Sequence, residues 1–272
     1  MREAVINDRA RRLDLSGAAS VTEPLVRFHT TGSLGVLVLD RPDAGNAITP
    51  ELILDLSTAL DAAASAPVRA VLMRAEGPNF CVGADLRHFT AHRHHIAEEL
   101  SAMADTFHAT LARLTELPVP VVAQVQGAAV GAGLGLVLAA DAVVCAESAK
   151  LMTGYARLGL SADAGVSFFL TRALGMRRAR WLLMSGRPLG AREALELGLC
   201  DEVCEPADLP ARASAVAEQL ALLPVEAAVA VKRLTAEAAA GADLRTQLDR
   251  ERQEITRLAA GPQLASALAP KG

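Results

Sequence analysis

The sequence predicts an α/β fold, and three observations lead to this prediction. Apolar runs of strand length alternate with helical patterns over the first two thirds of the chain. Glycine and proline bound several of these runs, as expected where strands end and turns begin. From about residue 165 the pattern becomes mostly helical. Because strands that alternate with helices favour parallel pairing, we expect an α/β core followed by a helical part.

The first elements can be predicted from turn and capping residues. The stretch LVRFHTTGSLGVLVLD, residues 25–40, reads as two strands around a glycine-centred turn. Thr49-Pro50-Glu51 places an N-cap residue, a first-turn proline and an early acid in order, so a helix should run from there to about Ala64.

Three further segments continue the alternation. VRAVLMRAE, residues 68–76, is a buried strand that Gly-Pro closes. After the loop NFCVGADLRHF, a long amphipathic helix is expected from about Ile96 to Leu117. Two prolines then lead into the strand VPVVAQV, a glycine-rich helix and the strand AVVCAE at residues 142–147.

The chain divides into three predicted parts. Residues 1–23 are charged throughout and are expected to form a flexible extension, and residues 24–205 form the α/β core. A last strand is expected around Leu199 to Cys204, and residues 206–272 form a helical C-terminal region.

Composition excludes several classes of function. The 272 residues are 51% hydrophobic and 21% charged, which is typical of a globular protein. A net charge of −4 and 3% aromatic residues argue against a nucleic-acid partner. No apolar stretch is long enough for a membrane span and no signal core stands at the N-terminus, so we expect a cytoplasmic protein without a membrane partner.

The four cysteines do not form a metal or redox motif. Cys200 and Cys204 are one residue too far apart for a CxxC pair, and Cys81 and Cys145 stand alone. We expect free thiols in a reducing compartment. Four of the six histidines gather in RHFTAHRHH, residues 87–95, where a solvated segment is favoured over a metal site.

The stretch QGAAVGAGLGLVLAAD, residues 126–141, resembles a nucleotide loop but lacks its defining residues. Leu136 stands where the third glycine of GxGxxG is required, and no Gly-Lys-Ser/Thr follows. The small residues can instead allow close helix packing. A second glycine turn, NFCVGADLRHF at 79–89, also follows a strand. Two such turns can present two backbone N–H groups to one oxygen, which makes an oxyanion hole.

Five segments, in order, resemble the signatures of the crotonase superfamily, the enoyl-CoA hydratase/isomerase family. They are LDRPDAGNAIT (39–49), NFCVGADL (79–86), PVVAQVQGAAVGAGLGLVLAAD (120–141), ARLGLSADAG (156–165) and AREALELGLCDEV (191–203). The resemblance covers about residues 25 to 260. It implies a spiral of β-β-α turns with a helical trimerisation region, and a homotrimer or a hexamer made of two trimers.

The resemblance also implies a substrate and its contacts. The substrate would be a thioester of coenzyme A or of another pantetheine carrier, with no cofactor beyond that moiety. The oxyanion amides would be those of Ala84 and Ala132. The other implied substrate-binding positions are Arg41, Asn46, Ala47, Val82, Gly83, Asp85, Leu86, Gly131 and Gly135. Arg87, His88 and Lys232-Arg233 are further candidates for the coenzyme end.

The sequence departs from the hydratases of this family at both catalytic acids. By the resemblance, their two glutamates correspond to Gly135 and Tyr155. Asp163 remains, at a position where some isomerases of the family carry a proton-transferring aspartate. A desolvated carboxylate beside an apolar acyl pocket would be a better base, although Asp163 can also be the N-cap of the next helix. Tyr155 is a further catalytic candidate, whose phenol can hydrogen-bond the substrate or donate a proton, or it can simply fill the space of the glutamate.

These residues support one preferred function and two alternatives. The preferred one is double-bond isomerisation of an enoyl-CoA, with Ala84 and Ala132 as oxyanion donors and Asp163 as base. The loss of both glutamates also allows a non-catalytic acyl-CoA-binding protein or a hydratase with an atypical site. The acyl group and the pathway are not encoded in any motif.

Overall fold

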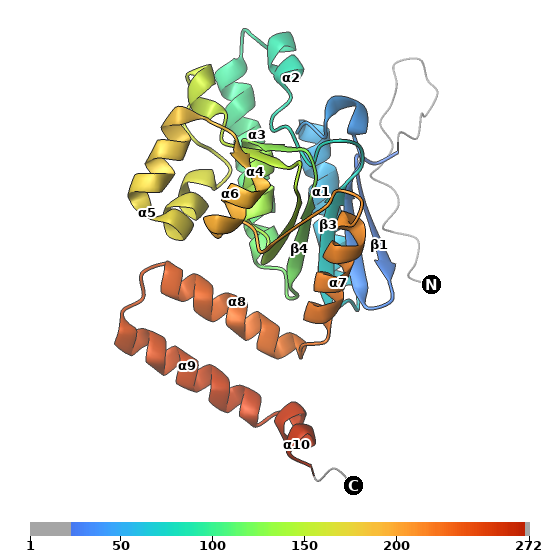
Figure 1. The fold of residues 1–272 in the computed structure, drawn as a ribbon, viewed down its shortest axis with the longest axis vertical. Coiled ribbons are helices and arrows are strands. Elements are labelled where there is room, and N and C mark those ends of the chain that lie inside the picture. The colour runs from blue at the N-terminus through green and yellow to red at the C-terminus, as the bar shows by residue number, and fades with distance from the viewer. Residues whose placement is uncertain (1–22, 270–272) are drawn as a thin grey trace.

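The computed structural model describes residues 23–269, and a six-stranded sheet lies at its centre (Figure 1). The spatial order is β1-β2-β3-β4-β6-β9. Strand β1 pairs antiparallel with β2, and the remaining neighbours pair in parallel, as the alternation predicts. The strands are β1 (Val26–Thr31), β2 (Leu34–Leu39), β3 (Ala70–Ala75), β4 (Val121–Val125), β6 (Ala142–Ala146) and β9 (Glu202–Cys204).

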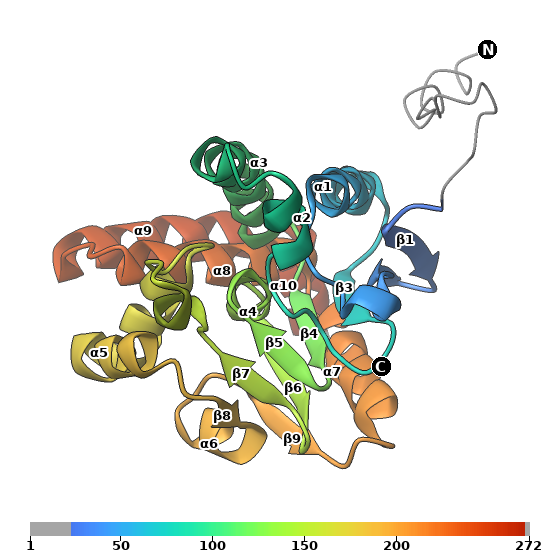
Figure 2. The same ribbon diagram turned by 90° about the horizontal axis from the view of Figure 1, so that it is seen from above.

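Helices cover both faces of this sheet, because apolar side chains occupy both sides of its strands. In β3, Val71 and Met73 face the larger core with the helices on one face, whereas Ala70 and Leu72 pack against α7 on the other. Figure 2 shows α1, α3 and α4 on one side of the strands and α7 on the other. The helices concerned are α1 (Pro50–Ser65), α2 (Leu86–Ala91), α3 (Ile96–Thr115), α4 (Ala132–Leu138), α5 (Val166–Ser185), α6 (Ala191–Glu196) and α7 (Leu209–Ala221).

The start of α1 follows the predicted capping chemistry. The Thr49 side chain accepts a hydrogen bond from the N–H of Leu52, and Pro50 occupies the first helical turn. The range given for α5 contains two helical segments that meet at a kink. Gly175 marks the junction with non-helical backbone angles, φ 73° and ψ 159°.

A second, three-stranded sheet was not predicted from the sequence. Its order is β5-β7-β8, with β5 and β7 parallel. Each strand has three residues or fewer, which is too short for a periodic pattern to show. This sheet places β5 between the strand β4 and the glycine-rich helix α4, which the sequence had predicted to be adjacent. The strands are β5 (Ala128–Val130), β7 (Lys150–Met152) and β8 (Leu189–Gly190).

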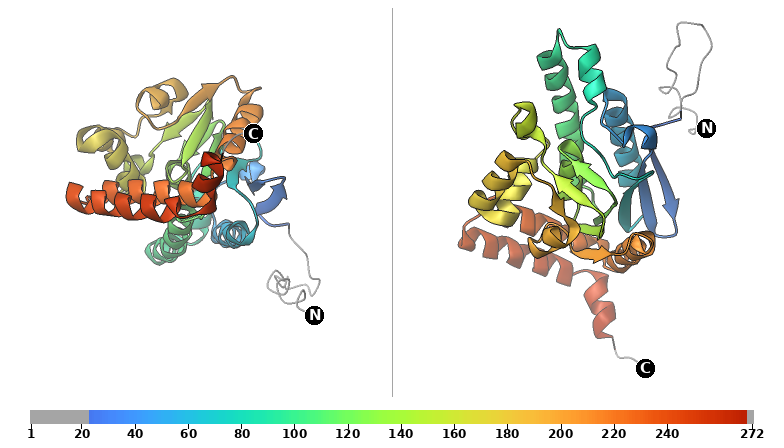
Figure 3. Two further views of the ribbon diagram at one scale, coloured as in Figure 1. Left: turned by 90° about the horizontal axis from the view of Figure 1, so that it is seen from below. Right: turned by 45° about the horizontal axis from the view of Figure 1, so that its top comes forward.

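The C-terminal part is helical, as predicted. Helices α8 (Val225–Ala239) and α9 (Leu244–Ala259) lie side by side and project from the core, with α10 (Pro262–Leu268) at their end (Figure 3). Lys232 on α8 ties this region to the core, because its Nζ lies 2.7 Å from Asp141 Oδ2 and 3.1 Å from Val119 O. The extension predicted at 1–23 lies outside the described residues except for Glu23, and the boundary at 205 stays a prediction.

Within the described part of the chain, no single helix has the length and apolar character needed to cross a membrane. Helices α7 and α8 meet that criterion only as a pair, which is bent by 101°.

Candidate functional site

Backbone pairing fixes the direction of the Ala84 N–H. Ile48 N donates to Gly83 O at 2.8 Å, and Asp85 N donates to Ile48 O at 2.9 Å. The carbonyl of Gly83 and the N–H of Asp85, on either side of Ala84, therefore both bond to Ile48. As in any extended strand, the N–H of Ala84 points to the opposite side, and no described group accepts a hydrogen bond from it.

The Ala132 N–H has no hydrogen-bond partner because of its position at the start of a helix. Ala132 is the first residue of α4, and the first N–H groups of a helix have no partner within the helix. Gly131 precedes it with φ 55°, a left-handed conformation that glycine adopts without strain. The N–H of Gly131 is held by Met152 O at 2.9 Å, which ties the start of the helix to β7.

The two turns are in direct contact. A Cβ placed on Gly83 would lie 2.7 Å from Val130 O and 3.8 Å from Ala132 N, so the backbones pass each other closely. A Cβ on Gly133 would lie 2.3 Å from Cys81 O, which requires glycine there as well. The structure thus brings together the two predicted amide donors. Two free N–H groups at such a junction can stabilise an oxygen that gains negative charge.

The Cys81 thiol lies beneath this junction and is not a nucleophile. Burial raises the pKa of Cys81 to about 12, although a hydrogen bond from the N–H of Gly83 offsets part of the effect. The thiol donates to Asn46 O at 3.1 Å. A protonated, fully buried thiol is chemically inert, so Cys81 serves as a link between backbone segments.

Asp163 is paired with a residue that the sequence analysis missed. Its Oδ1 lies 2.6 Å from Nε2 of His108, which projects from α3. The two side chains are 42% and 49% exposed, so the expected desolvation of the Asp163 carboxylate is not found. The alternative role as a helix cap is wrong, because α5 has Gly165 at its N-cap and no side-chain cap. No local motif marks His108, which lies 55 positions before its partner.

Tyr155 links the oxyanion region to the segment that carries Asp163. Its hydroxyl donates to Asp163 O at 3.1 Å, and its Cζ would lie 3.6 Å from a Cβ on Gly131. Burial, with the negative charge of Asp163, raises the pKa of Tyr155 above its ordinary value. Tyr155 is therefore unsuited to act as a base, and it positions the Asp163 backbone.

Gly135 is packed so tightly that no side chain fits there. A Cβ on Gly135 would lie 2.3 Å from Ala164 O and 3.0 Å from Ala164 Cβ. Ala164 itself has a positive φ of 54° and is fully buried. The space for a side chain at 135 is thus filled by the backbone next to Asp163.

A cavity of about 730 Å³ begins at His108 and Asp163 and extends between α3, α5 and α8. Its walls are largely apolar, and its far end contains the Lys232–Asp141 ion pair. Ala84 and Ala132 are not among the residues that line it. The apolar lining includes Leu111, Ala112, Leu138, Ala164, Phe168, Phe169, Ala236 and Ala239.

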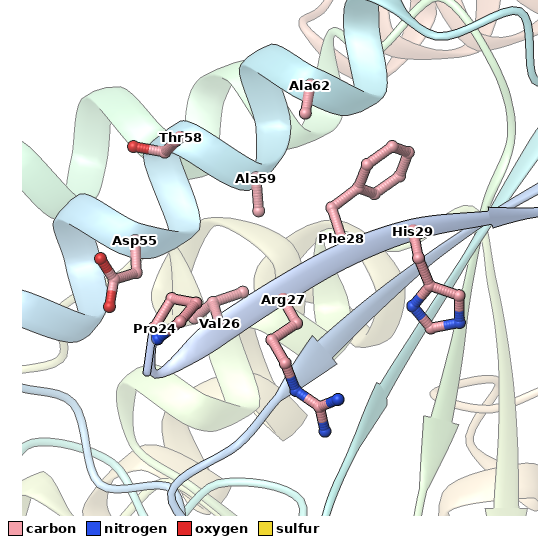
Figure 4. Close-up of a pocket in the computed structure, with 9 residues that line it drawn as sticks. All are labelled: Pro24, Val26, Arg27, Phe28, His29, Asp55, Thr58, Ala59 and Ala62. Atoms are coloured by element: carbon pink, nitrogen blue, oxygen red, sulfur yellow. The ribbon is translucent and has the colours of Figure 1, made fainter. Parts of the chain in front are cut away.

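A second cavity of about 650 Å³ lies between β1 and α1, away from this site (Figure 4). Its polar groups are engaged with other partners. Asp55 accepts a hydrogen bond from Leu25 N, and Arg27 pairs with Asp40 at 2.7 Å. We assign it no part in the chemistry.

Three of the predicted binding positions, Arg41, Asn46 and Asp85, have structural partners instead of open surface. Arg41 is ion-paired to Asp85, with Nη2 2.7 Å from Oδ2. Asn46 is fully buried, and its Nδ2 donates to Glu76 O and Asn79 O. The other predicted positions, Ala47, Val82, Gly83, Leu86, Gly131 and Gly135, lie on the backbone segments around the two turns.

The remaining candidate cations differ in availability. Arg87 is largely exposed and contacts Asp85 at 3.3 Å, whereas Lys232 is paired with Asp141 at 2.7 Å and Arg233 with Glu254. His88 contacts Glu99 at 3.3 Å. In residues 23–269, no group of three or more histidine, cysteine or acidic side chains is arranged to hold a metal ion.

Comparison with known proteins gives one family and several chemistries. Residues 29–263 match the enoyl-CoA hydratase/isomerase family model. A 4-chlorobenzoyl coenzyme A dehalogenase of Arthrobacter sp is 32% identical over 243 residues, which are 89% of this chain and 87% of that protein. A 1,2-epoxyphenylacetyl-CoA isomerase of Escherichia coli K12 is 33% identical over 226 residues, 82% of this chain and 86% of that one.

The fold agrees with the same assignment. The crystal structure of an enoyl-CoA hydratase from Polaromonas sp. JS666 superposes with a TM-score of 0.86 at 33% identity, covering 90% of this chain and 95% of that one. The mixed α/β core and the helical C-terminal region are therefore those of the crotonase fold. The chain belongs to the enoyl-CoA hydratase/isomerase family.

Proposed function

We propose that the protein isomerises a double bond in an acyl group carried as a thioester on coenzyme A or on another pantetheine carrier. The observation that carries this proposal is the 2.6 Å contact between His108 and Asp163, at one end of a largely apolar cavity. The thioester oxygen would accept hydrogen bonds from Ala84 and Ala132. This polarisation acidifies the neighbouring carbon, so that a carboxylate can remove its proton.

A single base is sufficient for this reaction. Asp163 would take a proton from one carbon, the electron pair would move through the enolate, and the same proton would return at another carbon. His108 engages Oδ1 of Asp163, whereas no described group bonds to Oδ2, which leaves that oxygen for the substrate. No water needs to be activated, in agreement with the absence of acids at Gly135 and Tyr155.

A second candidate function has its own support. Displacement of a halide from an aromatic acyl-CoA needs a nucleophilic carboxylate and a base that activates water. Asp163 would add to the ring carbon that bears the halide, with the charge delocalised to the thioester oxygen, and the halide would leave. Water deprotonated by His108 would then hydrolyse the aspartyl ester and release the hydroxylated ring. The pairing of these two side chains and the dehalogenase relative favour this alternative.

Product analysis separates the two reactions. The full chain would be incubated with a 3-enoyl-CoA, with crotonyl-CoA and with 4-chlorobenzoyl-CoA, followed by mass spectrometry and NMR. Isomerisation leaves the mass unchanged and moves the vinyl signals, hydration adds one water, and dehalogenation releases halide. With none of these products but tight acyl-CoA binding, the protein would be a carrier and the proposal would be wrong.

The role of Asp163 can be tested by substitution and by isotope labelling. Asp163→Asn should reduce turnover at least about 100-fold while acyl-CoA binding persists. Asp105→Asn, on the exposed side of α3, is the matched control and should leave turnover unchanged. In water enriched in ¹⁸O, single-turnover dehalogenation would place the label in the peptide that carries Asp163, whereas isomerisation would not label it.

We also propose that the protein is a homotrimer, or a hexamer of two trimers. Large apolar side chains remain exposed on α5, among them Met176, Trp181 and Met184, and on α9, among them Leu244 and Ile255. A monomer rarely exposes so many such groups together. Light scattering coupled to size exclusion should give the mass of three or six chains, and a monomer at micromolar concentration would contradict this proposal.

A further inference from the structure

Asp85 is a buried carboxylate directly after the proposed oxyanion donor Ala84. Its side chain is 6% exposed. Oδ2 lies 2.7 Å from Arg41 Nη2, and Oδ1 accepts a hydrogen bond from the N–H of Arg87 at 3.0 Å. The Asp85 carboxylate therefore holds its own turn through the Arg87 N–H and joins that turn to Arg41.

Arg41 connects this carboxylate to the strand-like segment that pairs with the donor. Its Nη1 donates to Ala47 O at 2.8 Å, while its own N–H donates to Asn46 Oδ1 at 2.8 Å. The guanidinium thus bridges Ala47 and Asp85, the residues next to the Ile48–Ala84 bridge. Through these contacts, the two backbone segments are held at a fixed distance and angle.

We propose that Arg41 and Asp85 are a positioning pair that aims the Ala84 N–H at the thioester oxygen, and that Arg41 is not a ligand of the coenzyme phosphates. The inference deepens the proposed function and depends on it for the role of Ala84. Arg41 is only 23% exposed and has three donors in use within the protein. Arg87 also contacts Asp85, but at the longer distance of 3.3 Å, and with 72% of its side chain exposed it is better placed to meet a phosphate.

The electrostatics of the pair agree with a permanent ion pair. Burial alone would raise the pKa of Asp85, but hydrogen bonds from Arg87 and Arg41 outweigh it and lower the pKa to about 2. The carboxylate is therefore charged at neutral pH. Removing Arg41 leaves this buried charge with Arg87 as its remaining ion-pair partner, at 3.3 Å, whereas removing both Arg41 and the Asp85 charge leaves no buried carboxylate to be paired.

The experiment compares two substrates of the full chain, one as the CoA thioester and one as the N-acetylcysteamine thioester, which lacks the phosphates. Arg41→Met should lower kcat about 10- to 100-fold on both substrates, with KM changed about twofold or less. A phosphate contact would instead raise KM for the CoA thioester alone, and that result would overturn the proposal. Arg41→Lys should recover part of the activity.

A spectroscopic readout keeps this test separate from the fate of the proposed reaction. Infrared difference spectra of a ¹³C-carbonyl butyryl-CoA, which cannot isomerise, report hydrogen bonding to the thioester oxygen. Bound to the unaltered protein, its stretching frequency should fall below that of free butyryl-CoA. An unshifted wild-type frequency would contradict the proposed oxyanion hole. A frequency that is shifted in the wild type and equally shifted in Arg41→Met and Asp85→Asn would overturn the positioning pair.

Two further variants control for folding. The double variant Arg41→Met/Asp85→Asn removes both charges, so it should fold better than either single variant while its carbonyl frequency stays close to the free value. Arg27→Met breaks an ion pair with Asp40 of the same 2.7 Å length at the sheet edge. It should change neither kcat nor the carbonyl frequency. A double variant that folds and restores full turnover would refute the proposal.

Discussion

Restoring a side chain at Gly135 should damage the protein instead of creating a hydratase. Gly135 stands where the family resemblance places a hydratase glutamate, and Gly135→Glu is therefore the obvious substitution to gain hydration. However, a Cβ at this position would lie 2.3 Å from Ala164 O. Ordinary van der Waals contact requires Ala164 to retreat by about 1 Å. Because Ala164 follows Asp163 directly, that movement also displaces the carboxylate.

The expected magnitude follows from two opposing terms. Alanine in place of a helical glycine gains about 1 kcal/mol of helix propensity, whereas overpacking a rigid core costs about 1–3 kcal/mol. Because the Cβ would lie only 2.3 Å from a backbone oxygen, the overpacking cost falls in the upper part of that range, about 2–3 kcal/mol, and we expect Gly135→Ala to lower the free energy of unfolding by about 1–2 kcal/mol. A displacement of about 1 Å in the catalytic group should lower turnover about 100-fold. Gly135→Glu should be worse, since it also buries a carboxylate.

Urea unfolding gives the stability change, and product analysis with crotonyl-CoA and a 3-enoyl-CoA gives the activity. Gly190→Ala is the matched control, because a Cβ there meets only Lys150 Nζ at an ordinary 3.6 Å and φ is −74°. It should change the stability by less than about 0.5 kcal/mol. Undiminished stability and turnover in Gly135→Ala would refute the packing argument, as would hydration gained by a stable Gly135→Glu protein.

Two other predictions concern residues around the site. Tyr155→Phe removes the hydrogen bond to Asp163 O but keeps the ring. Urea unfolding should show a fall of about 1 kcal/mol in the free energy of unfolding, and rate assays should show turnover reduced severalfold. Complete loss of turnover would instead make the phenol catalytic. The pKa of Asp85 falls from 3.8 to about 2 on folding, so its contribution is complete above pH 4 and is lost as the pH falls toward 2. Over that interval the wild type should lose about 2 kcal/mol more stability than Asp85→Asn, and equal slopes in acid unfolding curves would contradict the ion pair.

The longer elements of the fold could be predicted because their signals are local. Thr49 and Pro50 start α1, and a continuous apolar run defines β3. The short sheet β5-β7-β8 was not predicted, because strands of two or three residues are too short to show a periodic apolar pattern. Its pairing also depends on segments far apart in the chain. The bridge between Cys81 and Ala129 is of this kind.

The site divides in the same way. The two glycine turns are visible in the sequence, and the family resemblance implied Ala84 and Ala132 as the donors within them. His108 could not be identified, because it lies within a helix and is marked only by its contact with Asp163, 55 positions later in the chain. Arg41 was expected to hold the coenzyme, and its pairing with Asp85 changes that interpretation. A charged residue shows its chemistry in sequence, but its partner is set by tertiary structure.

The two positions that the family resemblance assigns to the hydratase acids, Gly135 and Tyr155, are both built into the support of Asp163. At Gly135, the space of a glutamate is occupied by the backbone of Ala164, and this backbone carries Asp163 toward His108. At the second position, Tyr155 fills the space between Gly131 and Asp163 and donates a hydrogen bond to the Asp163 backbone. Both substitutions therefore support the same carboxylate. A site that had only lost its acids would leave room for them, whereas here that room is filled by the segment that carries Asp163 to His108.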